Sequence, residues 1–147
     1  MKFDDIYFMN QALNIAKLAT KEGEVPVGAV IVIDNKIIAR AHNLTEKLHD
    51  VTAHAEMLAI TSASNFLNGK FLKGCTIYVT LEPCIMCTGA LYLSQINRLV
   101  IGASDLKMGG ISKGIKLHPK TKIKKGVLQE ESTNLIQEFF VKKRTKN

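Results

Sequence analysis

Hydrophobic residues recur at helical spacing near the start of the chain. A helix with one apolar face explains these steps of three or four, which run through Ile6, Met9, Leu13, Ala16 and Ala19. Asp4 or Asp5 can cap this helix, and we expect it to run to about Lys21. Its apolar face should pack into the core.

The hydrophobic pattern of residues 27–42 differs from that of the first helix and predicts a β-hairpin. Val27 to Ile33 is a near-continuous apolar run, which is typical of a strand covered on both faces. A tight connection at 34–36 leads to a returning strand at 37–42. After a polar loop, Thr52 is expected to cap a second helix that reaches about Asn65. Its inward-facing residues should be Met57, Leu58 and Ile60.

Strands and helices alternate in the rest of the chain. The β-branched and aromatic run 76–81 predicts a strand, and Pro83 suits the first turn of a helix that reaches about Ser94. We expect a strand at 98–102, an irregular loop at 103–121, an edge strand at 122–127 and a helix at 129–143. This order predicts one domain, residues 1–147, of α/β class. Its layers should be α/β/α around a five-stranded, mixed sheet.

The composition limits the class and location of the protein. Apolar residues make up 46% of the 147 residues, and no apolar run approaches the ~20 residues of a membrane span. Acidic residues near the N-terminus and the lack of a cleavage signal argue against a signal peptide. The three cysteines, two of them in a Cys-x-x-Cys pair, indicate metal or redox chemistry in a reducing compartment. We therefore expect a cytoplasmic protein without a membrane segment.

The positive charge is concentrated in the last third of the chain. The formal net charge is +7, but residues 1–105 carry nine Lys and Arg against ten Asp and Glu. Residues 106–147 carry eleven Lys and Arg against three Glu. Such a field suits a polyanion such as RNA, although a solvated basic surface would look the same in sequence.

Candidate metal ligands stand at two predicted helix starts. Cys84 and Cys87 are three residues apart at the start of one helix, where the dipole favours thiolates. His54 stands in the first turn of the other, and such turns meet at one edge of an open α/β sheet. One imidazole and two thiolates suit Zn²⁺ and leave one tetrahedral position open. Water there would have its pKa lowered to about 7.

Glu56 lies two residues after His54 and suits a different role. A carboxylate beside the bound water can take its proton and deliver it to a leaving group. Metal, water and proton shuttle together predict hydrolytic attack on a carbon that bears an amine. The pattern His-x-Glu with Pro-Cys-x-x-Cys is a general signature of zinc nucleobase deaminases.

The same residues are compatible with two different roles on sequence grounds. The Cys-x-x-Cys pair alone could be a thioredoxin-like redox site, which would leave His54 and Glu56 without a role. A structural zinc would need a fourth ligand, for which the available histidines are His42, His49 and His118. Glu82 fits a helix-start residue better than a catalyst.

The chain resembles bacterial tRNA-specific adenosine deaminases of the cytidine deaminase-like superfamily. The resemblance runs from the first helix to the last. It includes Glu24-Val25-Pro26-Val27-Gly28, Thr52-Ala53-His54-Ala55-Glu56 and Thr80-Leu81-Glu82-Pro83-Cys84, and the His/Glu/Cys set alone marks the superfamily. Gly102-Ala103-Ser104-Asp105, Lys107 and Phe139-Phe140 with a basic end favour the tRNA branch.

This resemblance implies an activity, a cofactor and partners. The wobble adenosine of a tRNA anticodon stem-loop would be hydrolysed to inosine by a homodimer that contacts the RNA with both subunits. One zinc ion per subunit would be held by His54, Cys84 and Cys87, with Glu56 as the proton shuttle. Contacts to the RNA are implied for Asn43, Asp105 and Arg144.

Two other functions compete with this hypothesis. A deaminase of a free base or nucleoside, such as guanine or cytosine, would share the zinc and Glu56 but would need no basic tail. An RNA-binding protein with a structural zinc would bind both metal and RNA without turnover.

Overall fold

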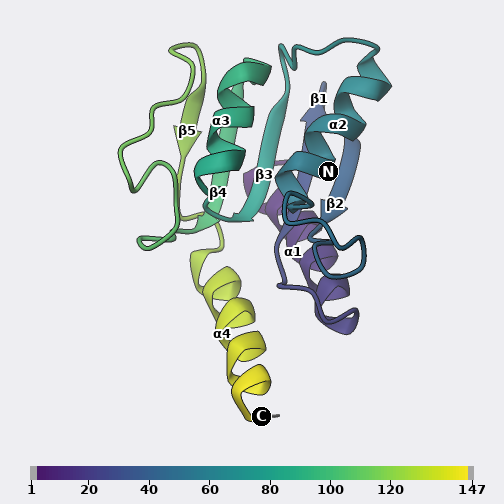
Figure 1. Ribbon diagram of the computed structural model, residues 1–147. Helices are drawn as coiled ribbons and strands as arrows, with labels where there is room; N and C mark the ends of the chain where they lie inside the picture. Colours follow the sequence, from purple (N-terminus) through teal and green to yellow (C-terminus); the bar gives the residue numbers. More distant parts are fainter. Residues whose placement is uncertain (1–2, 146–147) are drawn as a thin grey trace.

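Four helices and five strands make up the computed structural model, which describes residues 3–145 (Figure 1). The helices are α1 (Asp5–Lys21), α2 (Ala55–Leu67), α3 (Ile85–Ser94) and α4 (Gln129–Thr145). The strands are β1 (Gly28–Ile33), β2 (Lys36–His42), β3 (Thr76–Leu81), β4 (Arg98–Ala103) and β5 (Lys122–Lys124). None of the helices in this part of the chain is long and apolar enough to span a membrane.

The strands form one mixed sheet in the order β2-β1-β3-β4-β5. β1 is antiparallel to both of its neighbours, and Ala29 pairs with Ala41 of β2 on one side and with Val79 of β3 on the other. β3, β4 and β5 are parallel to one another. Because β1 is antiparallel to both β2 and β3, these two strands run in the same direction.

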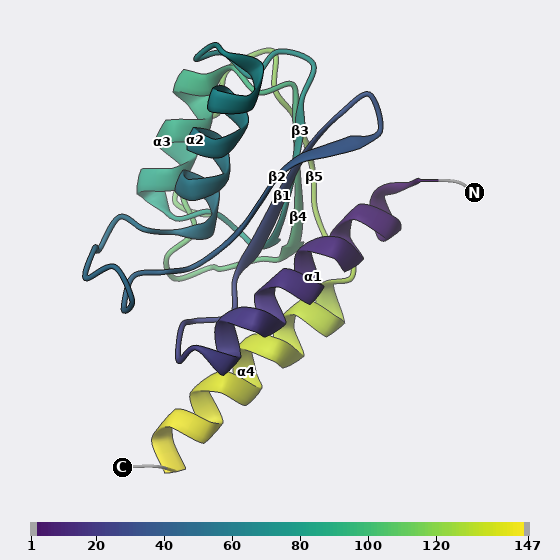
Figure 2. The same cartoon turned by 90° about the vertical axis from the view of Figure 1, so that its right-hand side faces the viewer.

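Helices cover both faces of this sheet, as Figure 2 shows: α2 and α3 on one face, α1 and α4 on the other. The core accordingly has two clusters, and Phe8, Met9 and Ala12 of α1 belong to the one that contains Val30 and Tyr78. Gly28 lets α1 approach β1 closely, since a Cβ there would overlap the carbonyl oxygen of Ala12. The predicted α/β/α fold with a five-stranded mixed sheet is confirmed.

Several predicted details of packing and boundaries were wrong. The edge strand β5 pairs over only three residues, 122–124, rather than six. In α2 the fully buried apolar side chains are Ala55, Ala59 and Ala63. Of the larger residues expected to face inward, Ile60 packs against the core while partly buried, whereas Met57 and Leu58 do not. Small side chains allow α2 to lie close to the sheet, so its larger residues move to the edges of the contact. Ile6, expected in the core, is 54% exposed.

A single carboxylate ties α1 to three strands. Asp5 accepts a bidentate hydrogen bond from Arg98 of β4, at 2.7 and 2.6 Å, and another from the hydroxyl of Tyr78 in β3, at 2.7 Å. Lys124 of β5 adds an ion pair at 3.1 Å. The pKa of Asp5 is held well below its usual range, chiefly by the hydrogen bonds from Arg98 and despite partial burial. These bonds fix the first turn of α1 on the sheet.

Replacing this carboxylate should make the fold less stable near neutral pH. For Asp5→Asn we expect a loss of about 1–3 kcal/mol of unfolding free energy at pH 7, because charge-assisted hydrogen bonds are lost. The pKa of Asp5 is lower in the folded state than the value of about 3.9 in the unfolded state. The ionised side chain therefore stabilises the folded state at pH values above about 3.9, and this stabilisation is lost as the pH falls below that value. Urea unfolding should therefore show that the unfolding free energy falls less between pH 7 and pH 3 in the variant than in the parent. Parallel pH profiles would contradict this role.

Candidate active site

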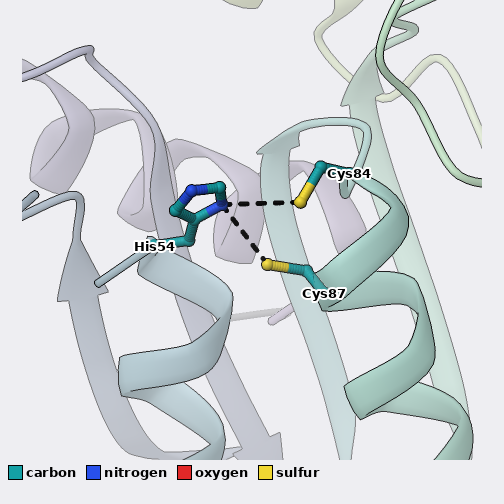
Figure 3. Close-up of side chains that lie close together, drawn as sticks. All are labelled: His54, Cys84 and Cys87. Carbon is teal, nitrogen blue, oxygen red and sulfur yellow. Dashed lines mark hydrogen bonds between the residues drawn. The ribbon is translucent and has the colours of Figure 1, made fainter. Parts of the chain in front are cut away.

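The direction of two strands brings two helix starts together. β2 and β3 run the same way, so α2 and α3, which follow them, both begin at the same edge of the sheet (Figure 1). His54 is the N-cap residue of α2, Cys84 is the N-cap residue of α3, and Cys87 lies in the first turn of α3. Figure 3 shows the imidazole of His54 pointing at both sulfurs.

The separations within this group match a tetrahedral metal site. Nδ1 of His54 lies 3.5 Å from Sγ of Cys84 and 3.6 Å from Sγ of Cys87. Zinc with Zn–S of about 2.3 Å and Zn–N of about 2.0 Å would place nitrogen and sulfur about 3.5 Å apart. The three ligand atoms all lie within 4.8 Å of one another, and no further His, Cys, Asp or Glu of residues 3–145 joins the group. The donor set therefore fits a zinc ion with one open coordination position.

The ligand side chains do not cap their own helices. Asn43 does this for α2: its Oδ1 accepts a hydrogen bond of 2.9 Å from the backbone N–H of Ala55. The expectation that Thr52 is the cap was wrong, because Thr52 donates its hydroxyl and N–H to Asp50 instead. His54 is thereby free to turn its ring towards the sulfurs.

The two thiols differ in acidity. The pKa of Cys84 is lowered to about 5, mainly because the Cys87 thiol donates to its sulfur, and the N–H groups of Cys87 and Met86 add to the effect. The pKa of Cys87 is raised, first by this shared hydrogen and then by burial. The sequence predicted two thiols that ionise easily. Without a metal, one hydrogen shared between the two sulfurs lowers the pKa of Cys84 and raises that of Cys87. A zinc ion held by both sulfurs would displace the shared hydrogen, since both ligands would then be thiolates.

Glu56 lies beside the ligands without being one of them. Glu56 is 4% exposed. Burial raises the pKa of its carboxyl group to about 7, and the nearby His54 partly offsets this effect. A carboxyl group with a pKa near neutrality can both accept and donate a proton, as general acid–base catalysis requires.

A cavity of about 270 Å³ opens over His54, Cys84 and Glu56. Its further lining residues come from the strand ends and loops at this edge: Val25, Val27, Asn43, Thr45, Leu81, Glu82, Asp105 and Met108. This volume lies just under the ~300 Å³ at which pockets for drug-sized ligands begin. The cavity suits one small, flat group with an apolar face and a few polar atoms.

The structure brings together most of the predicted site residues, with one exception. Asn43 and Asp105 line the same cavity as His54, Glu56 and Cys84, and Cys87 joins them through the ligand group. Oδ1 of Asp105 also accepts from the N–H groups of Lys107 and Met108, so it caps a turn. Arg144 is exposed in the last turn of α4 and does not line this cavity.

The sequence analysis did not predict that two buried glutamates hold the loops around the site. Glu24 is fully buried and accepts hydrogen bonds from Glu46 and Lys47 in the loop after β2. Glu82 is 3% exposed and accepts from the loop after β4. The signal available in the sequence was a charged residue directly next to an apolar run, at 24–25 and at 81–82. Burial of such a charge requires several donors.

Comparison with known proteins agrees with this geometry. Residues 2–103 match the model of the cytidine and deoxycytidylate deaminase zinc-binding region. The tRNA-specific adenosine deaminase of Aquifex aeolicus is 48% identical, over 94% of this chain and 95% of that protein.

Two solved structures are also similar. One, from studies of A-to-I editing by tRNA:A34 deaminases at the wobble position, has a TM-score of 0.82 and 40% identity over 88% of this chain and 98% of that chain. A guanine deaminase from Bacillus subtilis has a TM-score of 0.67 and 36% identity over 69% of this chain and 66% of that chain. The fold, the ligand set and these similarities show that the chain belongs to the tRNA-specific adenosine deaminases, within the zinc-binding cytidine and deoxycytidylate deaminase family.

Proposed function

We propose that this protein hydrolyses the wobble adenosine of a tRNA anticodon to inosine and releases ammonia. The observation that carries the proposal is the tetrahedral spacing of His54, Cys84 and Cys87 with a buried Glu56 beside them, at the bottom of one cavity. A water oxygen adds to C6 of the purine, the C6–N bond breaks, and the amino nitrogen leaves as ammonia.

Glu56 moves the protons in this reaction. Bound zinc supplies Lewis acidity that makes water a good nucleophile near neutral pH. The Glu56 carboxylate takes a proton from the attacking water and returns it to the amino nitrogen that leaves. Burial of Glu56 excludes bulk water from this transfer.

The cavity receives a base that has left its stack. An anticodon loop presents unstacked bases, which makes extrusion of one nucleoside inexpensive. Oδ1 of Asn43 is already used by Ala55, so its amide N–H groups remain for an acceptor atom of the nucleoside. Asp105, which lines the same cavity, would lie near the adjoining nucleotide of the loop. Val25, Val27 and Leu81 supply the apolar surface for the ring.

The basic end of α4 supports an RNA substrate. In Figure 1, α4 extends beyond the edge of the sheet at which α2 and α3 begin. Its last turn carries Lys142, Lys143 and Arg144, all exposed. Cations placed there can contact phosphates on either side of a nucleotide bound in the cavity. A tRNA substrate is compatible with the cytoplasmic location expected from the sequence.

An apolar face on α3 supports the homodimer. Ile85, Tyr92 and Leu93 are 50%, 43% and 73% exposed, and together with Met57 and Met86 they line a shallow groove. Contiguous exposed apolar surface of this kind is typical of protein–protein contacts. Because α3 also carries both cysteine ligands, a second subunit on this face would lie close to the cavity.

A free-base deaminase is the second candidate. The likeness to a guanine deaminase favours it, and the same ligands and Glu56 would serve it. It offers no explanation for the cluster of cations at the end of α4.

Substrate assays separate the two candidates. Purified protein loaded with zinc should form inosine at the wobble position of a tRNA stem-loop, detected by mass analysis after nuclease digestion. Free adenosine, guanine and cytosine should remain unchanged, because they lack the phosphate contacts that add to binding. Turnover of a free base together with an inert stem-loop would favour the second candidate.

Changing Glu56→Gln should abolish turnover while leaving the metal in place. The amide keeps the size of the side chain but cannot accept the proton, so we expect kcat to fall by about 10³-fold or more. Zinc content, measured by atomic spectroscopy, should stay at one ion per chain because Glu56 is not a ligand. A parent protein that binds zinc and RNA but shows no turnover would instead favour a non-enzymatic RNA-binding protein.

Removing the basic end of α4 should weaken RNA binding. Changing Lys142, Lys143 and Arg144 to Ala should raise KM for the stem-loop about tenfold and lower the slope of log KM against log salt by about 2. A charge-matched control changes Lys36, Lys70 and Lys73, which lie at or near the starts of β2 and β3, at the other edge of the sheet. An equal effect from both triple variants would mean that net charge alone matters.

A further inference from the structure

In one wall of the cavity, a single buried side chain at the end of β3 accepts three hydrogen bonds from the loop after β4. The loop after β4 contributes Asp105 and Met108 to the cavity. Glu82, directly after β3, accepts hydrogen bonds from this loop at both of its oxygens. Oε1 accepts from the N–H of Asp105 at 3.1 Å and from the hydroxyl of Ser112 at 2.8 Å, and Oε2 accepts from the N–H of Ser112 at 2.9 Å.

These contacts need a carboxylate. All three partners are donors, and a carboxylate offers only acceptor positions, whereas an amide would turn an N–H group towards one of them. Glu82 is 3% exposed, so water cannot replace a lost partner. Gly109 leaves the room for it, because a Cβ at that position would overlap the carboxyl group of Glu82.

The held loop presents groups that a substrate would meet. Met108 is 55% exposed although it lines the cavity, and Leu106 beside it is 84% exposed. Asp105 fixes the turn between them through the N–H groups of Lys107 and Met108. The wall is also held by the N–H of Gly110, which donates to the carbonyl of Pro83 at 2.9 Å, and by Ile111, which packs against the core. Glu82 is the side chain that fixes Asp105 itself.

We propose that Glu82 is a positioning residue: it fixes the wall that carries Asp105 and Met108 and thereby sets the affinity for the nucleotides next to the reacting adenosine. This inference rests on the proposed function. Glu82 lines the cavity but is not one of the metal ligands, and both of its oxygens are occupied by donors of the wall, so its loss changes KM far more than kcat.

The test is Glu82→Gln in the full chain loaded with zinc. Gln keeps one acceptor oxygen, so we expect hydrogen exchange, followed by NMR, to accelerate about tenfold or more at the backbone N–H of Asp105 or of Ser112, whichever faces the amide nitrogen. KM for the stem-loop should rise about tenfold, with kcat within threefold of the parent. Zinc content should remain at one ion per chain. This last measurement matters because Cys84 is only two residues away.

The matched control is Asp5→Asn, a second carboxylate-to-amide change that removes several hydrogen bonds on the other side of the sheet. It should lower stability without changing KM. If Glu82→Gln does not fold, Ser112→Ala takes its place: it removes one of the three bonds and should raise KM two- to threefold.

Three results would overturn the proposal. Unchanged exchange at Asp105 and Ser112 would mean that Glu82 does not hold the wall. Faster exchange with an unchanged KM would mean that the held position is irrelevant to the substrate. A collapse of kcat with loss of zinc would assign Glu82 to the metal segment instead. A parent without activity on the stem-loop would refute the proposed function, whereas the exchange measurement would still report on the wall.

Discussion

The shared direction of β2 and β3 is the constraint on which the site depends. It places the N-termini of α2 and α3 at one edge of the sheet, and a helix N-terminus is where N–H groups and the dipole stabilise a thiolate. The imidazole and the sulfurs come from segments 30 residues apart in the chain, yet they meet at bonding distance from a common centre. The strand directions in the sheet therefore bring the metal ligands together, and side-chain packing only adjusts their positions.

Burial of polar groups follows the same logic around the cavity. Its bottom consists of helix starts, held by the core packing of α2 and α3. Its walls combine strand ends that pack into the core with loops that buried acceptors hold: Glu24 for the loop after β2, Glu82 for the loop after β4, and Asn43 for the start of α2. A buried acceptor is stable only when its donors are in place, so each loop has one defined position.

Sequence patterns predicted what depends on local order and missed what depends on distant partners. Alternating strands and helices follow from hydrophobic periodicity, and His54, Glu56, Cys84 and Cys87 follow from spacing, so both were predicted. Thr52 is a residue type that often caps a helix, but the acceptor for the N–H of Ala55 comes from Asn43, 12 residues upstream. The support given by Glu82 was equally hidden, since its partner Ser112 is 30 residues away. Only the folded chain shows which donor reaches which acceptor.

The ties of Asp5 have a consequence for the order in which the enzyme matures during synthesis. Its partners Tyr78, Arg98 and Lys124 follow it by 73, 93 and 119 residues. Translation runs from the N-terminus, so α1 leaves the ribosome among the first elements but acquires these partners only after β5 has emerged. Contacts of such long sequence separation form slowly. A nascent chain thus carries the apolar face of α1 without its final anchor until most of the protein has been made.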